Sequence, residues 1–199
     1  MSTDDTTTDG RRLRRDNNRR AVVDALLNLF QEGNLSPSTE EIAARSGVSS
    51  RSLFRYFDDV DDLARSAILA EFHRVRHLTP VAVRPDQPLA TRLSELATQR
   101  SVLWEAVGPV AMVSRMRAHK NPTIAESLRT NRRLAREQVA GVIGPELAAA
   151  GPHGAQLLAL ADVLTSFETW WLLRDDQSLS VDASRVAILE GLTRLFPDR

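Results

Sequence analysis

Residues 38–57 read STEEIAARSGVSSRSLFRYF, and their spacing predicts two short helices joined by a tight turn. Ser38 and Glu41 can form a capping box that starts the first helix ahead of Ile42. Gly47 follows where the turn needs a left-handed backbone, because glycine adopts a positive φ without steric penalty. The apolar residues on both sides of the turn can share one core. The pattern predicts a helix-turn-helix motif at residues 38–57, whose second helix enters the major groove of DNA.

The outer surface of the predicted second helix is polar and basic. Residues 48–57 contain two arginines, three serines and one tyrosine, and no acidic residue. Arg51 lies in the first turn, where a guanidinium can pair with guanine through two hydrogen bonds, and Ser50 beside it can contact a base or a phosphate. The other polar side chains suit phosphate oxygens, which fix position without reading sequence; they are Ser49, which can also cap the helix, Ser52, Arg55 and the Tyr56 hydroxyl.

Charge changes abruptly in the chain before this motif. Residues 1–10 show no apolar pattern and are expected to be disordered, whereas residues 11–20 hold six arginines against one aspartate. We expect a flexible arginine-rich arm over residues 1–15 that lies along the DNA backbone or enters the minor groove. A solvated tail is the alternative. The arginines expected to contact DNA are Arg11, Arg12, Arg14 and Arg15.

The rest of the chain has helical periodicity, and no segment alternates as a strand would. Apolar residues recur at one-face helical spacing over residues 22–30, and Gly33 follows as a stop. Further helices are expected at residues 58–79, 89–117, 122–150, 154–176 and 181–196, with Pro109 splitting the second and Gly144-Pro145 interrupting the third. We therefore expect an all-α protein, with a three-helix DNA-binding domain over residues 16–64 and a larger helical domain over residues 65–199.

Composition excludes several classes of function. The 199 residues include no cysteine, which rules out disulfides, thiolate zinc sites and a cysteine nucleophile. The 26 basic and 26 acidic residues balance, so a polyanion-binding surface must arise from how charge is distributed. The longest apolar runs are shorter than the ~18 residues that span a bilayer, and the acidic N-terminus is unlike a signal peptide. We expect a cytoplasmic protein with no membrane partner.

Three other clusters have competing interpretations. Residues 58–62, DDVDD, have the carboxylate spacing with which prenyl-diphosphate enzymes bind Mg²⁺, but no second acidic motif accompanies them, and a capped acidic helix start is favoured. His73 and His77 have metal-ligand spacing but lack the glutamate of a metalloprotease. A basic helix face is interpreted as solvated, with contact to an anionic effector or a partner as the alternative; it comprises Arg129, Arg132, Arg133 and Arg136. We expect no catalytic residues, metal or cofactor.

Apolar residues near the C-terminus repeat at intervals of three and four, which predicts a seam between helices. Two such helices from each subunit would form a four-helix dimer interface, with core packing inside one subunit as the alternative. The predicted interface residues are Leu157, Leu160, Leu164, Trp171, Leu189 and Leu192. Large adaptable apolar residues could line a ligand pocket, although such residues more often fill cores; they are Phe72, Trp104, Met112, Met116, Phe167 and Trp170.

From about Arg19 to Phe72 the sequence resembles the tetracycline-repressor (TetR) family of bacterial regulators, through AVVDALLNLFQEGNLSPSTEEIAARSGVSSRSLFRYFDDVDDL. The resemblance implies a homodimer with an N-terminal helix-turn-helix and a larger C-terminal domain that binds an effector and dimerises. It implies base contacts from Ser50 and Arg51, and contacts near phosphates from Ser49, Ser52, Phe54, Arg55 and Tyr56. Thr39 is a further residue expected to bind DNA. Two residues depart from the family pattern, since Phe54 stands where tyrosine is common and Val60 where lysine is common. Both departures weaken anchoring to the DNA backbone.

These observations predict a dimeric, sequence-specific transcriptional regulator. We expect a repressor that a small-molecule effector releases from a palindromic operator on double-stranded DNA. The alternative is a helical small-molecule sensor with weak or no specific DNA binding, which the departures at Phe54 and Val60 would allow.

Overall fold

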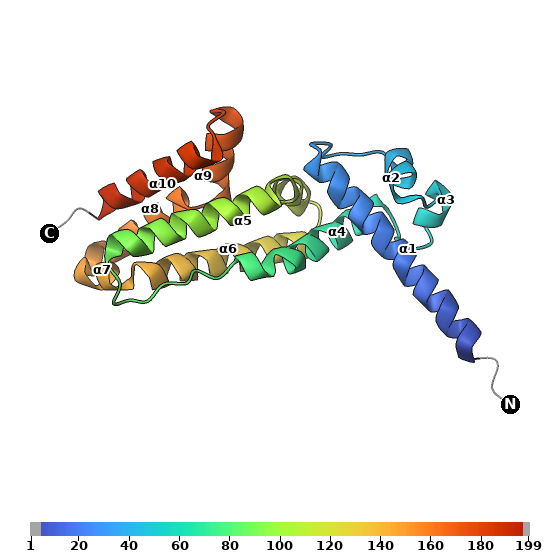
Figure 1. Ribbon diagram of the computed structural model, residues 1–199, viewed down its shortest axis with the longest axis horizontal. Helices are drawn as coiled ribbons and strands as arrows, with labels where there is room; N and C mark the ends of the chain where they lie inside the picture. The colour runs from blue at the N-terminus through green and yellow to red at the C-terminus, as the bar shows by residue number, and fades with distance from the viewer. Residues whose placement is uncertain (1–4, 197–199) are drawn as a thin grey trace. The chain divides into compact units, whose positions relative to one another are not determined.

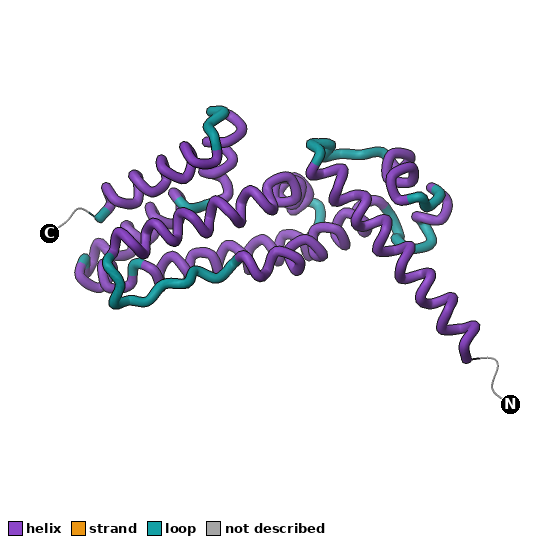
Figure 2. The backbone as a smooth tube through the Cα atoms, in the orientation of Figure 1, coloured by secondary structure: helices purple, strands orange, loops and turns teal. Residues whose placement is uncertain are grey.

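The structure is a computed structural model that describes residues 5–196, and every regular element within them is a helix (Figures 1 and 2). The predicted all-α class is therefore confirmed. The described residues form two compact units. The N-terminal unit comprises the described residues up to Arg74 together with Pro109–Ala125. The C-terminal unit comprises Val75–Gly108 and the described residues from Glu126 onward.

Four helices make up most of the N-terminal unit. They are α1 (Asp5–Gln31), α2 (Thr39–Ser46), α3 (Ser50–Leu53) and α4 (Val60–Arg74). Helix α1 packs against α2 and α4, and α2 packs against α3. Each helix contributes apolar side chains to the interior, and burying one stabilises the fold by about 1.5–3 kcal/mol. The buried set includes Leu26, Phe30, Ile42, Leu53, Leu63 and Ile68.

Helix α1 corrects the prediction of a disordered lead and a flexible arm over residues 5–15, whereas residues 1–4 of that prediction lie outside the described residues. It begins at Asp5 and runs without interruption to Gln31, so the arginine-rich residues belong to a helix. Arginine and leucine are good helix formers, and Arg14 Nε donates to the Gly10 carbonyl at 3.2 Å across one turn. Figure 1 shows the first turns of α1 extending past α2 and α3.

Helix α3 is shorter than predicted. Regular helix ends at Leu53, and the chain continues to Phe57 in tight turns, with Tyr56 N donating to the Leu53 carbonyl at 2.9 Å. Phenylalanine and tyrosine lose side-chain freedom against the preceding turn, so the aromatic residues that follow Leu53 favour helix only weakly.

The C-terminal unit is also entirely helical where it is described. Helices α5 (Leu89–Ala118) and α6 (Pro122–Val142) contribute to both units, and α5 is preceded by a 3-10 helix, Val75–Leu78, that directly continues α4. The remaining helices are α7 (Gly144–Ala149), a 3-10 turn (Gly151–His153), α8 (Gly154–Leu164), α9 (Phe167–Trp171), a π-helical turn (Leu172–Asp176) and α10 (Val181–Leu195). The boundary predicted after residue 64 falls inside α4.

Two prolines are expected from the sequence to interrupt helices, and one of them does. The break at Gly144-Pro145 is confirmed, since α6 ends at Val142 and α7 begins at Gly144. The split at Pro109 is wrong, because α5 passes through Pro109 as one helix. Proline removes one N–H donor from the helix. Val107 and Val110, close to Pro109 in the sequence, are buried, and their packing holds this part of α5 in place.

One apolar core holds the C-terminal unit together. It draws on α5, α6, α8, α9 and α10, and its fully buried members include Leu96, Val139, Ile143, Trp170, Ile188 and Leu192. A buried ion pair joins α5 to α7, with Arg92 Nη2 2.5 Å from Glu146 Oε1. Helices α8 and α10 approach closely at Gly191, where an added Cβ would lie 3.3 Å from the Leu164 side chain.

Candidate nucleic-acid interface

Helix α2 begins and ends as its sequence predicts. Ser38 Oγ accepts a hydrogen bond from the Glu41 backbone at 3.2 Å, and the Ser38 backbone donates to Glu41 Oε2 at 2.7 Å, which confirms the capping box. Asn34 also donates to Glu41, and these hydrogen bonds to the carboxylate hold the pKa of Glu41 below its ordinary value. At the other end Gly47 has a φ of +69°, the left-handed conformation expected for the turn.

An ion pair fastens the end of α2 to the segment that follows α1. Arg45 donates to both carboxylate oxygens of Glu32, at 2.6 and 2.7 Å. The hydrogen bonds from Arg45 lower the pKa of Glu32. This two-pronged contact fixes α2 relative to α1, and α2 is the helix that supports the predicted recognition segment.

The predicted recognition segment is anchored by its apolar side and leaves its basic side outward. Ser49 caps α3, since its Oγ accepts from the Ser52 backbone at 3.3 Å and donates to Ser52 Oγ at 3.0 Å. Leu53 and Phe57 are buried, whereas Arg51 and Arg55 are exposed. Of the other predicted contacts, Ser49 is exposed, and Thr39, Ser50, Ser52 and Tyr56 are half-buried.

Two residues of α1 hold the recognition segment and were not predicted to do so. Asn18 Nδ2 donates to the Tyr56 hydroxyl at 3.1 Å, which leaves the hydroxyl hydrogen free to donate to a phosphate. The Arg19 guanidinium lies 4.9 Å from the centroid of the Phe57 ring and donates to Ser66 Oγ at 3.1 Å. Both residues belong to the polar, basic run at residues 11–20, and nothing in that run distinguishes a residue that holds the fold from one that is free to contact DNA.

Most arginines of the N-terminal unit fall into two groups. Four of them form ion pairs with carboxylates: Arg45, Arg65, Arg74 and Arg117. Six others form no ion pair with any side chain that the structure describes, which are those of residue 10 and residues 12–196: Arg12, Arg14, Arg15, Arg20, Arg51 and Arg55. The side chain of Arg11 lies outside what the structure describes. Helix α1 and the recognition segment therefore carry arginines that form no ion pair with a described acidic side chain, and such positive charge attracts phosphates.

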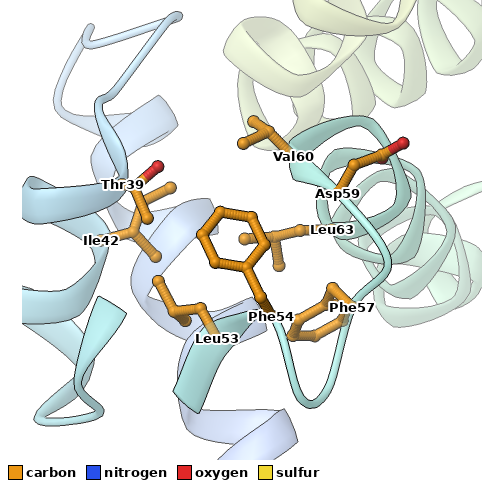
Figure 3. Close-up of a pocket in the computed structure, with 8 residues that line it drawn as sticks. All are labelled: Thr39, Ile42, Leu53, Phe54, Phe57, Asp59, Val60 and Leu63. Atoms are coloured by element: carbon orange, nitrogen blue, oxygen red, sulfur yellow. The ribbon is translucent and has the colours of Figure 1, made fainter. Parts of the chain in front are cut away.

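Phe54 lines a shallow apolar hollow that is open to solvent, and 53% of the Phe54 surface is exposed. Figure 3 shows its ring between Thr39 and Ile42 of α2 on one side and Val60 and Leu63 of α4 on the other. The ring offers no hydrogen bond to a phosphate. It can instead make apolar contact with a sugar or a thymine methyl group.

The acidic residues at the start of α4 are engaged within the unit. Asp59 Oδ1 accepts from the Asp62 backbone at 2.7 Å and caps the helix. Asp62 in turn pairs with Arg65, and Asp61 pairs with Arg117 at the end of α5. These pairs reduce the repulsion that the acids would exert on DNA. The described part of the chain contains no group of three or more histidine, aspartate or glutamate side chains placed to hold a metal ion.

The residues predicted for an effector pocket divide between the two units. Phe72, Met112 and Met116 belong to the N-terminal unit. Trp104, Phe167 and Trp170 belong to the C-terminal unit, where the Trp104 and Phe167 rings meet edge to face with centroids 5.8 Å apart. Phe167 and Trp170 are fully buried, and Trp170 Nε1 donates to Glu105 at 2.9 Å. These two residues act in the core of the unit.

The residues predicted for a dimer interface have several environments. Leu192 is fully buried, and Leu157, Leu164 and Leu189 are partly buried against the core of their own unit. Trp171 is half-buried, whereas Leu160 is 51% exposed. Two valines of the same helices are also exposed, Val163 of α8 at 61% and Val186 of α10 at 44%. Leu160, Val163 and Val186 thus give these two helices exposed apolar surface.

Comparison with known proteins finds a family whose sequence model matches part of the N-terminal unit. The sequence model described as bacterial regulatory proteins, tetR family, matches residues 22–67. No curated protein matches the chain at the level of sequence. No helix in the described residues has the length and apolar character needed to cross a membrane.

Solved structures share the fold over both units. A transcriptional regulator from Rhodococcus sp. Rha1 matches with a TM-score of 0.65 and 17% identity, over 91% of this chain and 95% of the other. A protein assigned to the TetR-family transcriptional regulators, from Rhodococcus sp., matches with a TM-score of 0.58 and 18% identity, over 90% and 99%. The multidrug binding protein EbrR, solved with imidazole, matches with a TM-score of 0.59 and 21% identity, over 91% and 96%.

Proposed function

Because its sequence at residues 22–67 and its fold make this chain a DNA-binding transcriptional regulator of the TetR family, we propose that it is a homodimeric repressor. A small-molecule effector releases it from a palindromic operator. It acts in the cytoplasm, by binding rather than by catalysis.

The observation that carries this proposal is the set of arginines in α1 and the recognition segment that form no ion pair with a described acidic side chain. Arg51 and Arg55 are exposed and form no ion pair with the described residues, in a unit where four other arginines are paired with acids. A surface that keeps its cations free gains affinity for DNA by releasing counterions from the phosphates. Arg51 stands in the first turn of α3, where it can also read a base edge.

A homodimer is supported by the exposed apolar residues of α8 and α10. Leu160, Val163 and Val186 leave apolar surface in contact with water, which a second copy of the same face would cover. A two-fold dimer places two recognition segments about 34–36 Å apart, which is one turn of DNA. Sedimentation of Val163→Asp and Leu160→Asp tests this face, because each buries a charge in the proposed interface and should yield monomers. Val181→Asp, a substitution at the first residue of α10, is the matched control and should leave the dimer intact.

Fluorescence anisotropy with DNA from the upstream region of the protein's own gene tests sequence-specific binding. The native duplex is compared with a shuffled duplex of equal composition at two salt concentrations. At least about 1,000-fold preference for the native duplex is expected of a specific regulator. Arg51→Ala should lower that preference, whereas Arg15→Ala should weaken binding to both duplexes equally.

A sensor with little specific DNA binding is the second candidate, and the exposed Phe54 favours it. Phe54 cannot donate to a phosphate, and Val60 adds no charge at the start of α4. Equal, weak and steeply salt-dependent binding to both duplexes, together with no enriched site in a genome-wide pull-down, would favour the sensor over the repressor.

A further inference from the structure

One arginine of the C-terminal unit is buried without an acidic partner. Arg100 of α5 is 1% exposed, and no described carboxylate forms an ion pair with it. Arg92, two turns earlier on the same helix, is buried as well but pairs with both oxygens of Glu146. Buried cations are normally paired, because leaving water is costly for an isolated charge. Arg100 therefore differs from Arg92 in lacking a counter-ion among the described residues.

The contacts of Arg100 leave part of its hydrogen-bonding capacity unused. Nη1 donates to Gln99 Oε1 at 2.7 Å and to Gln138 Oε1 at 3.1 Å, and Nη2 donates to the Ala135 carbonyl at 3.0 Å. Nε is buried and has no hydrogen-bond partner among the described residues. Burial lowers the pKa of Arg100 to about 10, so the guanidinium remains charged at neutral pH.

Neighbouring charges do not supply the missing counter-ion. The negative charge of Asp162 acts on Arg100, but Asp162 Oδ2 lies 3.2 Å from Arg136, with which it forms an ion pair. The other arginines on the basic face of α6 are matched to acids in the same way. The pairs are Arg129 with Glu126, Arg132 with Glu168, and Arg133 with Glu137. The arginines on the basic face of α6 are therefore all paired with acids, whereas Arg100 has no acidic partner among the described residues.

An apolar aromatic surface adjoins the buried cation. The Arg100 guanidinium lies 5.9 Å from the centroid of the Trp104 ring. Trp104 is only half-buried; its ring meets Phe167, and its Nε1 donates to the Thr165 carbonyl at 3.0 Å. A ligand reaching Arg100 along this surface would meet a guanidinium at one end and aromatic carbon along its body.

We propose that Arg100 is the recognition group for an effector that carries a carboxylate on an apolar body. A guanidinium matches the planar, two-oxygen geometry of a carboxylate, and the unpartnered Nε–H supplies a donor that no described protein group uses. This inference rests on the proposed effector-dependent function and names the chemical class of the effector.

The amides that contact Arg100 also connect it to the end of the segment that continues α4. Gln99 Nε2 donates to the Leu78 carbonyl at 2.7 Å, and Gln138 Nε2 donates to the Thr79 carbonyl at 2.9 Å. A carboxylate that draws the guanidinium toward itself weakens the hydrogen bonds from Arg100 to both amide oxygens. Binding at Arg100 therefore affects the hydrogen bonds that the two amides donate to the Leu78 and Thr79 carbonyls. These carbonyls lie at the end of the 3-10 helix, an element often found at hinges.

Acid and amide pairs of the same shape test the charge requirement on the full-length wild-type protein. Benzoate and phenylacetate are titrated against benzamide and phenylacetamide at pH 7, with tryptophan fluorescence and thermal shift as the two measurements. We expect the acids to bind at least about tenfold more tightly than the amides, as for a hydrogen bond to a charged group. Equal binding of acids and amides overturns the proposal, as does failure of both acids to bind at about 10 mM.

Variants then test Arg100 itself. Arg100→Gln and Arg100→Met are expected to weaken acid binding about 10- to 100-fold and to leave amide binding unchanged. Arg132→Gln, which removes an exposed and paired cation from α6, should bind the acids as the wild type does. A folded Arg100 variant with unchanged acid affinity overturns the proposal. If neither variant folds, the wild-type comparison of acids with amides decides.

The anisotropy assay separates this inference from the function on which it rests. Release of operator DNA by an acid and not by its amide supports both. Operator binding that only neutral compounds relieve overturns the assignment of Arg100 and leaves the repressor in place. A protein that prefers acids but shows no operator preference supports the carboxylate site and overturns the proposed repressor.

Discussion

Substitution of Gly47 tests whether the turn between α2 and α3 depends on a left-handed backbone. Gly47 has φ +69° and ψ +12°, and an added Cβ would meet nothing within 4 Å. The cost of Gly47→Ala is therefore conformational alone, about 1–2 kcal/mol. For a chain of this size, 1 kcal/mol moves the melting temperature by about 2–4 °C. We expect Gly47→Ala to melt about 2–8 °C below the wild type.

Two further glycine variants test whether the effect of Gly47→Ala comes from the left-handed backbone. Gly141 also has open space around it but lies within α6, so Gly141→Ala should raise stability by about 0.5–1 kcal/mol. Gly47→Asn should fall between Gly47→Ala and the wild type, since asparagine enters the left-handed region more readily than alanine. The assay is thermal unfolding by circular dichroism at one protein concentration, because oligomer stability depends on concentration. A Gly47→Ala protein as stable as the wild type would refute the argument.

Three other predictions concern pH, salt and packing. Arg45 holds the folded-state pKa of Glu32 below its ordinary value of 4.5, so the ion pair stabilises the protein above that pH and loses its contribution as the pH falls further. Stability of Glu32→Gln to urea should therefore decline less steeply than that of the wild type between about pH 5 and 3. An equally steep decline in both proteins would contradict the role given to the pair. Removal of residues 1–15 should weaken binding to all DNA sequences. The slope of log affinity against log salt concentration should fall in magnitude by about 0.9 for each phosphate that the protein no longer neutralises. An unchanged slope would show that the arginines of this segment contact no phosphate. Gly154→Ala should lower the free energy of unfolding in urea by about 1–3 kcal/mol, because the new Cβ would lie 2.7 Å from the Leu147 carbonyl oxygen. An unchanged free energy of unfolding would mean that the backbone there moves freely.

Local interactions made much of the N-terminal unit predictable. The capping box of Ser38 and Glu41, the cap at Ser49 and the positive φ of Gly47 all depend on residues a few positions apart. Such interactions leave a pattern in the sequence, and the structure confirms each of them. Asn18 contacts Tyr56 across 38 positions of the chain, and no local pattern indicates such a pair.

The predictions that the structure corrects have physical causes of the same kind. The local sequence predicts a helix break at Pro109, but α5 continues through it, since packing outweighs one missing hydrogen-bond donor. The start of α1 has no apolar face and so resembles a disordered segment, yet the helix begins at Asp5. The arginines and leucine of residues 11–15 favour helix, whereas nothing in the weak helix formers of residues 5–10 explains so early a start. Arg100 resembles any solvated arginine in the sequence, and only the long-range packing of α5 against α6 shows that it is buried.

The path of the chain between the two units has a consequence for modularity. The N-terminal unit takes in Pro109–Ala125, so the chain crosses between the two units three times, and two of the crossings fall within α5 and α6. A recombination event at a single loop therefore cannot transplant the DNA-binding unit intact. A chimera that exchanges only the residues up to Arg74 inherits Asp61 without the Arg117 that pairs with it. The two units of this architecture should consequently evolve together, with residues 109–125 changing in step with the rest of the N-terminal unit.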